Sequence, residues 1–172
     1  FGLVETRAAE SVALDEGAPN VAGAGQIMVL DLDDPNESGL QKQGLLRFEQ
    51  SVIEGLVPRG ACMVSAQLVL TSTDDGDRIA LHPMLTPWTA ETTWASFGGD
   101  GISLNNVEAA ATPDTLTGRW DTAGFAVLDV TTRVRAWLDG APNHGWALVS
   151  RGPNGVDIAP AGAASSPRLL VR

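Results

Sequence analysis

FAVLDVTTRVRAWLDGAPNHGWAL, at residues 125–148, changes its hydrophobic period twice, and the rest of the chain can be placed around it. Residues 125–130 alternate between two faces as in a strand, with Phe125, Val127 and Asp129 on one face and Ala126, Leu128 and Val130 on the other. Over 131–138 the apolar residues recur at helix spacing, and Gly140 follows as a typical helix end. Residues 146–149 are apolar again and indicate a strand. The stretch therefore predicts a strand, one short amphipathic helix and a second strand.

The rest of the sequence indicates many short strands joined by turns. Its 19 Gly and 10 Pro are spread along the length, as expected where many strands need many turns. Consecutive apolar residues over 44–49 indicate a strand that is buried on both faces. About nine strands with regular turn signals predict an all-β fold: an antiparallel β-sandwich with one short helix at about 131–138. Besides those above, strands are expected at 3–6, 12–14, 26–32, 61–73, 78–84 and 167–172, the first two in preference to a helix over 1–16.

Length and composition fit one globular domain that covers residues 1–172. Hydrophobic residues make up 44% of the chain, which is enough for a real core. The single Cys62 excludes an internal disulfide, and we interpret it as a small buried hydrophobic residue. No apolar run approaches the roughly 20 residues that a membrane-spanning helix needs. No signal peptide is recognised, but the chain begins at Phe1 without Met, which indicates a mature form or an excised fragment.

The charge balance limits the classes of partner. One Lys stands against ten Arg, and the formal net charge is −10. A surface this acidic disfavours nucleic acid and anionic membranes as partners, because both carry negative charge. It also disfavours a polyanionic polysaccharide unless the arginines are clustered locally. We therefore expect no nucleic acid and no membrane among the partners.

Five sequence segments carry a resemblance to a known family. They are QGLLRFE, VPRGACMVSAQLVL, LHPMLTPWTAETTW, LDVTTRVRAWLDGAPNHGWAL and SSPRLLVR, which follow in this order from about Gln43 to Arg172. Together they resemble the DNRLRE domain family, a group of secreted β-sandwich modules. The acidic residue that the family shows after its LLRF strand is Glu49 here.

The resemblance implies a jelly-roll-like module that forms one part of a larger exported protein. Some relatives are classed as carbohydrate-binding modules, and others lie beside glycan-degrading enzymes or in surface proteins. The resemblance also implies a secreted or cell-surface location. The chain contains no Tyr, which leaves Trp as the usual residue for stacking on a sugar ring.

No constellation for catalysis is recognised. The two histidines, His82 and His144, lie in different segments. Neither is accompanied by a nucleophile elbow, a zinc-binding helix motif or a pair of cysteines. We therefore expect a protein that is not an enzyme.

One acidic stretch has the composition of a calcium site. Carboxylate oxygens that lie close in sequence suit Ca²⁺, which takes six to eight oxygen ligands. Pro35 stands where an EF-hand loop would have its third ligand, so the pattern is not that of an EF-hand. A structural calcium ion that holds the loops is one interpretation, and a solvated polar turn is the other. The candidate ligands are Asp31, Asp33, Asp34 and Glu37.

The tryptophans divide into two groups. Four of them, Trp88, Trp94, Trp137 and Trp146, lie in apolar surroundings and are expected in the core. Trp120 stands instead among polar and Gly residues, between Arg119 and Asp121. An exposed Trp with flanking charges suits a sugar-binding site, because the ring stacks on the pyranose and the charges bind its hydroxyls. The alternative is that Trp120 folds back as a lid on the sandwich.

These observations predict a non-catalytic extracellular module for binding or anchoring. The expected ligand is a polysaccharide or cell-surface glycan, and the other expected partners are further domains of the parent protein. The alternative is a structural spacer, or an adhesin or surface-layer module, with no small ligand. An accessory domain that orients an attached hydrolase is a third possibility.

Overall fold

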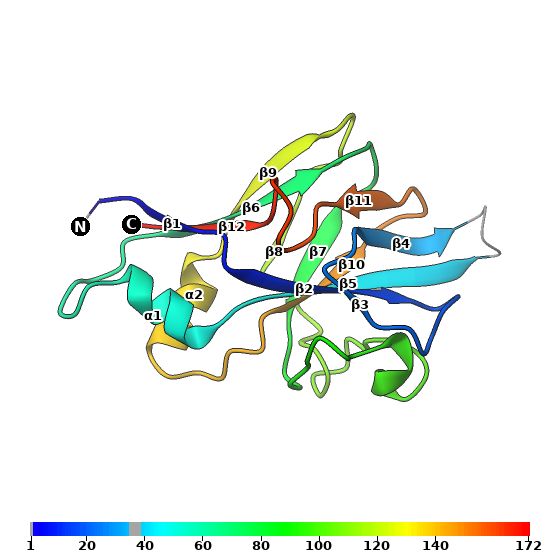
Figure 1. The fold of residues 1–172 in the computed structure, drawn as a ribbon, viewed down its shortest axis with the longest axis horizontal. Helices are drawn as coiled ribbons and strands as arrows, with labels where there is room; N and C mark the ends of the chain where they lie inside the picture. Colours follow the sequence, from blue (N-terminus) through cyan, green and yellow to red (C-terminus); the bar gives the residue numbers. More distant parts are fainter. Residues whose placement is uncertain (1, 35–38) are drawn as a thin grey trace.

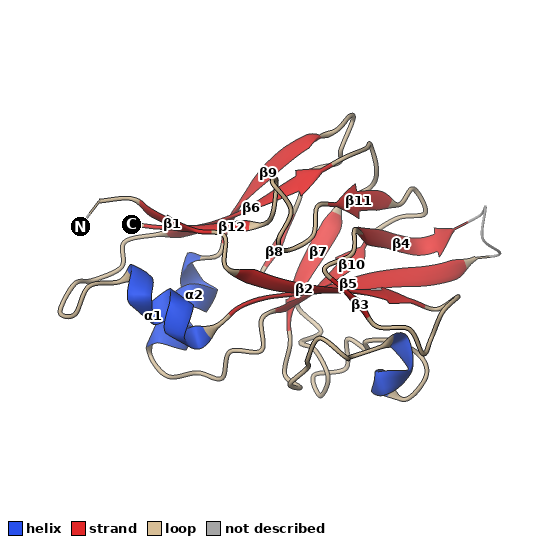
Figure 2. Cartoon of the chain, in the orientation of Figure 1, coloured by secondary structure: helices blue, strands red, loops and turns tan. Residues whose placement is uncertain are grey.

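The fold is mostly β. The computed structural model describes residues 2–34 and 39–172, and for Asp33 and Asp34 the backbone alone. The described chain forms a twelve-stranded antiparallel sheet, two short α-helices and one 3-10 helix (Figures 1 and 2). The expectation of an antiparallel all-β fold is confirmed. No described helix has the length and apolar character that a membrane crossing requires.

The strands pair in the order β1-β12-β6-β11-β4-β5-β10-β7-β8, while β9 adds to β6, β2 to β5 and β3 to β2. The elements are β1 (Val4–Thr6), β2 (Ala9–Asp15), β3 (Gly23–Ala24), β4 (Met28–Asp34), β5 (Leu40–Phe48), α1 (Gln50–Leu56), β6 (Ala66–Ser72), β7 (Ile79–Pro83), η1 (Trp94–Phe97), β8 (Thr115–Leu116), β9 (Gly124–Asp129), α2 (Thr131–Leu138), β10 (Trp146–Ser150), β11 (Val156–Ile158) and β12 (Arg168–Val171).

The two chain ends lie side by side. β1 pairs antiparallel with β12, and Val4 lies opposite Val171. Figure 1 shows the N- and C-termini next to each other at the end of the molecule that also holds both α-helices. The pairing of β1 with β12 therefore brings the two ends of the chain together.

The strand–helix–strand stretch folds as its periods predict. On β9, Phe125 and Val127 are exposed, whereas Leu128 is buried on the opposite face. α2 spans residues 131–138 and buries Val134 and Trp137. The chain then turns at Gly140, whose φ of 99° lies in the region that favours glycine.

The larger core cluster combines strands from distant parts of the sheet. It contains Ile79 and Leu81 from β7 as well as Leu169 and Val171 from β12. Trp137 from α2 packs against Trp146 of β10 with the ring centres 4.7 Å apart, so the helix closes this cluster at one end.

A second core cluster covers the other face of β5 and β10. Leu45 belongs to this cluster and Leu46 to the larger one, so adjacent residues of β5 are buried on opposite faces. Trp88 and Trp94, from the long connection after β7, lie over this second face. The predicted double burial of the strand at 44–49 is confirmed, as is the burial of the four core tryptophans.

The structure differs from the expected elements mainly between β5 and β6. Residues 50–56 form α1, whereas the sequence indicates one helix only. The strand expected over 61–73 begins at Ala66, because the chain before it is irregular and Val64 is exposed. Cys62 lies in this irregular segment and is exposed, so its interpretation as a buried residue is wrong.

Candidate functional site

The ring of Trp120 lies in the core. Its backbone exchanges two hydrogen bonds of 2.9 Å with Gly76, and this bridge turns the side chain inward until 6% of the residue is exposed. Arg119 and Asp121 on either side are exposed, and the guanidinium of Arg119 lies 3.8 Å from the carboxylate of Asp77. The structure thus shows the lid-like alternative for Trp120. It leaves the Trp120, Arg119 and Asp121 group without the exposed ring face that sugar stacking needs.

The predicted calcium ligands fall largely outside the described side chains. Asp31 is buried in β4 with 6% exposure. Glu37 lies outside the described residues, and so do the side chains of Asp33 and Asp34. Among the residues that the structure describes, no group of three or more His, Cys, Asp or Glu side chains is arranged to hold a metal ion. Calcium at residues 31–37 therefore stays a prediction.

His82 has the surroundings of a buried structural residue. It is 1% exposed on β7, and its Nδ1 lies 2.8 Å from the carbonyl oxygen of Ala110. Burial lowers the pKa of His82 below its ordinary value of 6.5, because the charged imidazolium is poorly solvated there. A neutral ring in this position ties β7 to the loop that covers the second core cluster.

An open cleft of about 350 Å³ lies between the β2–β3 hairpin and the loop that carries Trp88. Its volume is within the range of small-molecule sites. Both polar and apolar side chains face it. The cleft is lined by Glu10, Ser11, Val12, Ala24, Gly25, Arg47, Trp88, Thr89, Ala90 and Ala161.

Arg47 organises this cleft. Its Nη2 donates to Glu10 at 2.5 Å and lies 2.9 Å from a carboxylate oxygen of Glu49. Its Nη1 donates to the carbonyl oxygen of Trp88 at 3.3 Å, and the guanidinium carbon lies 4.6 Å from the centre of the Trp88 ring. The Trp88 indole in turn donates to the carbonyl oxygen of His144 at 2.7 Å. The wall is therefore fixed by cation–π and hydrogen-bond contacts before any ligand arrives.

The exposed charged groups at the cleft are mainly carboxylates, which accept hydrogen bonds from a ligand and do not donate them. The side chains of Glu10 and Glu49 are 50% and 49% exposed, whereas that of Arg47 is 15% exposed. Two carboxylates share one guanidinium, so this corner keeps a net negative charge. The exposed carboxylate oxygens can accept hydrogen bonds from hydroxyl groups, which a sugar offers in quantity.

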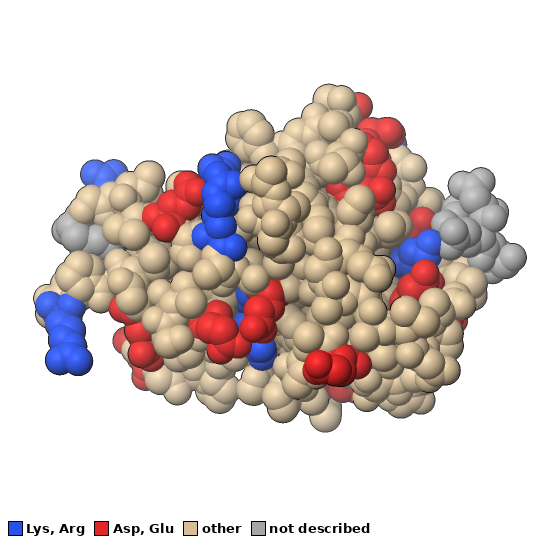
Figure 3. All heavy atoms as spheres, viewed as in Figure 1, with Lys and Arg blue, Asp and Glu red and all other residues tan. Residues whose placement is uncertain are grey.

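Acidic and basic side chains are mixed on the face of the molecule that Figure 3 shows. On the face in Figure 3, basic side chains lie among acidic ones, and most of the surface is uncharged. Several arginines are paired with carboxylates, among them Arg7 with Glu5 at 3.0 Å and Arg133 with Asp114 at 2.8 Å. The expectation that nucleic acid and acidic polymers are poor partners stays a prediction from the net charge.

Comparison with known proteins identifies no family for this chain. A scan against protein-family models finds no family that matches this chain, and a search of curated proteins finds no matching protein. The resemblance to the DNRLRE domain family therefore stays a prediction from the sequence motifs.

The sequence alone did not single out the cleft residues. Arg47 and Glu10 are 37 positions apart, and Arg47 and Trp88 are 41 apart. One signal was present, because Arg47 is a charged residue within an otherwise apolar strand over 44–48. A long cationic side chain on a doubly buried strand needs a carboxylate partner or an aromatic face, and here it has both.

Proposed function

We propose that this chain is a non-catalytic binding module for a neutral polysaccharide, part of a larger secreted or cell-surface protein, and that the cleft around Arg47 is its binding site. The observation that carries the proposal is the preformed wall of Arg47, Trp88 and Glu10, with half-exposed carboxylate oxygens beside an apolar floor. Sugar rings combine hydroxyl groups with apolar C–H faces, and this cleft offers a partner to each.

The proposal includes the β-sandwich of jelly-roll type that the sequence predicts. Its support is the larger core cluster, which joins β7 and β12 although they lie far apart in the order of the sheet. A sheet that buries such distant strands together behaves as two packed layers.

The size and charge of the cleft limit the classes of ligand that it can bind. An enclosed cavity of about 150 Å³ holds benzene, so an open cleft of about 350 Å³ gives room for at least one sugar unit. The net negative charge near Glu10 and Glu49 disfavours uronic acids and sulfated sugars. A neutral glycan chain is therefore the ligand class that fits best.

The test is a pull-down of the whole chain on insoluble cellulose, xylan, mannan and chitin, with cross-linked, insoluble polygalacturonate as the acidic comparison. We expect retention on at least one neutral polymer and none on polygalacturonate. Glu10→Gln should weaken binding about fivefold or more, because a charged acceptor becomes a neutral one. Glu54→Gln on α1, away from the cleft, is the matched control and should bind as the parent does. Folded protein that binds none of these polymers would overturn the proposal.

A structural role is the second candidate, and one observation favours it. Phe125 is 71% exposed and Val127 50% exposed on β9, which pairs with β6 alone, so an apolar strip lies at a sheet edge. Such strips suit packing against a neighbouring domain. Phe125→Ser would abolish concentration-dependent self-association in sedimentation if the strip packs on a second copy. Monomeric behaviour of the parent chain at all concentrations would remove self-packing from consideration.

The calcium prediction has its own test. Thermal unfolding of the chain is recorded with EDTA and then with added Ca²⁺. A structural ion held by residues 31–37 raises the unfolding midpoint when Ca²⁺ is present, because the ion binds the folded state only. Equal midpoints in both conditions would show that these residues hold no calcium.

A further inference from the structure

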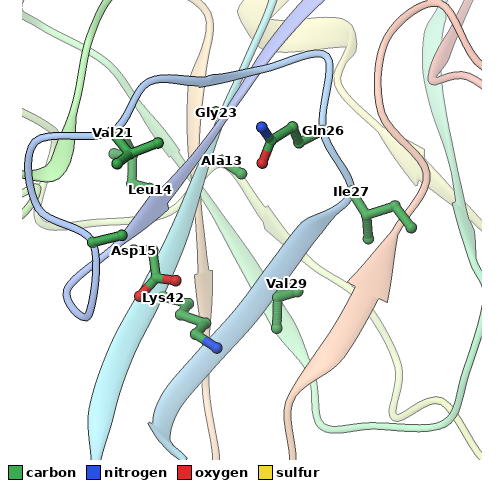
Figure 4. A pocket seen from close by; sticks show the side chains of 10 residues that line it. Ala13, Leu14, Asp15, Val21, Gly23, Gln26, Ile27, Val29 and Lys42 are labelled. Atoms are coloured by element: carbon green, nitrogen blue, oxygen red, sulfur yellow. The ribbon is translucent and has the colours of Figure 1, made fainter. Parts of the chain in front are cut away.

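A second hollow lies at the other end of β2, where β2, β5 and the start of β4 meet (Figure 4). Its volume is about 150 Å³. The turn before β3 and the connection from β3 to β4 supply its rim. The hollow is lined by Ala13, Leu14, Asp15, Ala18, Val21, Gly23, Gln26, Ile27, Val29 and Lys42.

This hollow is separate from the Arg47 cleft. Successive side chains of a strand point to opposite faces. Val12 belongs to the second core cluster, beside the cleft, whereas Ala13 packs on the larger cluster. The two hollows share no lining residue, although both use residues of the same hairpin.

The apolar part of the rim is open to solvent. Val21 is 57% exposed and Ile27 48% exposed, and both line the hollow together with Val29. Large aliphatic side chains that surround a concave surface provide the contact that the C–H face of a ring needs. A flat exposed patch would not enclose a ring in this way.

The polar part of the wall is built from three different groups. Asp15 accepts the amide hydrogen of Gly17 at 2.7 Å through Oδ1, which fixes its carboxylate and leaves Oδ2 for another donor. Figure 4 shows the Gln26 amide and the Lys42 side chain on the walls of the same hollow. Gln26 is exposed, so its amide is accessible to a ligand as both donor and acceptor.

The Lys42 side chain is a largely buried part of this wall. It is the single lysine of the chain and 9% exposed. Asp31 lies opposite it in the β4–β5 register, and the Lys42 charge partly opposes the rise that burial and the nearby Asp74 cause in the pKa of Asp157. The lysine charge is therefore balanced within the protein, and the hollow does not need an anionic ligand to neutralise it.

From these observations we infer that the hollow between β2, β4 and β5 is a second sugar site, which takes a single neutral pyranose ring. A cavity of about 150 Å³ lined by aliphatic side chains holds a ring of the size of benzene, and the open rim of this hollow leaves room for the hydroxyl groups of a pyranose. The carboxylate, amide and ammonium on its walls match ring hydroxyls, which an aromatic ring lacks. The choice of a sugar as ligand rests on the proposed function. With both sites in use, the module holds two glycan segments at separate places on its surface.

The experiment titrates the ¹⁵N-labelled chain with methyl glycosides of glucose, galactose, mannose and N-acetylglucosamine, and with cyclohexanol as a ring that lacks the additional hydroxyls. At least one glycoside should shift the amide signals of Gly23, Gln26 and Ile27 with millimolar affinity, as expected for one small polar ring. Gln26→Ala should weaken that affinity about fivefold, the loss of one neutral hydrogen bond. Gln67→Ala, an exposed glutamine on β6, is the matched control and should leave it unchanged. Ala18→Leu should fill the hollow and abolish the shifts.

The outcomes separate the two proposals. Shifts confined to Ser11 and Thr89 would overturn the second site and support the cleft. Shifts at Gly23 and Gln26 without retention on any polysaccharide would support the second site and remove the proposed function of the cleft. Equal shifts with cyclohexanol and the glycosides, or none with any ligand, would overturn the inference.

Discussion

Asp114 holds together the region where α2, β10 and the loop before β8 meet. Its carboxylate accepts hydrogen bonds from Arg133 Nε at 2.8 Å, from Arg133 Nη2 at 2.9 Å and from Trp146 Nε1 at 2.9 Å. Trp146 is completely buried, and the Asp114 carboxylate is the acceptor that the structure gives to its indole N–H. Asp114→Ala is therefore the substitution that most directly tests the packing of this end of the core.

The expected cost follows from these contacts. A buried donor left without a partner costs about 1–3 kcal/mol. The ion pair with Arg133 is partly exposed, so its loss adds less than about 1 kcal/mol. We therefore expect Asp114→Ala to lower the free energy of unfolding by about 2–3 kcal/mol. For a chain of this length, the midpoint of thermal unfolding should fall by roughly 5–10 °C.

The assay is urea unfolding followed by tryptophan fluorescence and circular dichroism. Asp121→Ala, at an exposed position, is the matched control and should change the free energy of unfolding by less than about 0.5 kcal/mol. Trp146→Phe removes the indole donor, so Asp114→Ala should cost about 1–2 kcal/mol less in that background than in the parent. A loss that is the same in both backgrounds, or a parent-like Asp114→Ala protein, would refute the reasoning.

Two further predictions concern His82 and Gly145. Because burial lowers the pKa of His82, the unfolded chain binds a proton at this residue more readily than the folded chain does. The free energy of unfolding therefore has its highest value above about pH 6.5 and decreases as the pH falls below that value. Urea titrations at several pH values between neutrality and mild acid should show this slope, and His82→Gln should reduce it; an unchanged slope would contradict the assignment. Gly145 has a φ of 69°, and a Cβ there would collide with the carbonyl oxygen of Leu46. Gly145→Ala should therefore cost more than about 2 kcal/mol, whereas Gly140→Ala, which has positive φ but open space, should cost about 1 kcal/mol. Similar losses in the two variants would show that the close approach at Gly145 does not matter.

Much of the fold was predictable because the spacing of apolar residues along the chain indicates the type of each element and its buried face. Phe125 and Val127 alternate with buried neighbours on β9, and the helical spacing that follows places Trp137 in the core. The apolar run at 44–49 predicted a strand buried on both faces, and Leu45 and Leu46 indeed lie in different core clusters. Such patterns need no knowledge of the partner segment.

Other features depend on contacts that local sequence does not specify. α1 is short and contains Gly55, so its own propensity for helix is weak. It lies against α2, where Gln50 donates to the carbonyl oxygen of Trp137 at 3.1 Å. Trp120 has polar neighbours in sequence, yet the bridge to Gly76 turns its ring into the core.

The sequence by itself determined the class of fold, most of the strands, the helix at 131–138 and the four core tryptophans, because burial on one face repeats with the period of the element. Only the tertiary structure decided where a ligand site can lie. Arg47, Glu10 and Trp88 come from separate segments and meet only after the strands have paired. The second hollow likewise exists only because β4 and the β2–β3 hairpin meet around Lys42. Concave surfaces arise from the packing of distant segments, and the spacing of apolar residues along the chain does not specify which distant segments pack together.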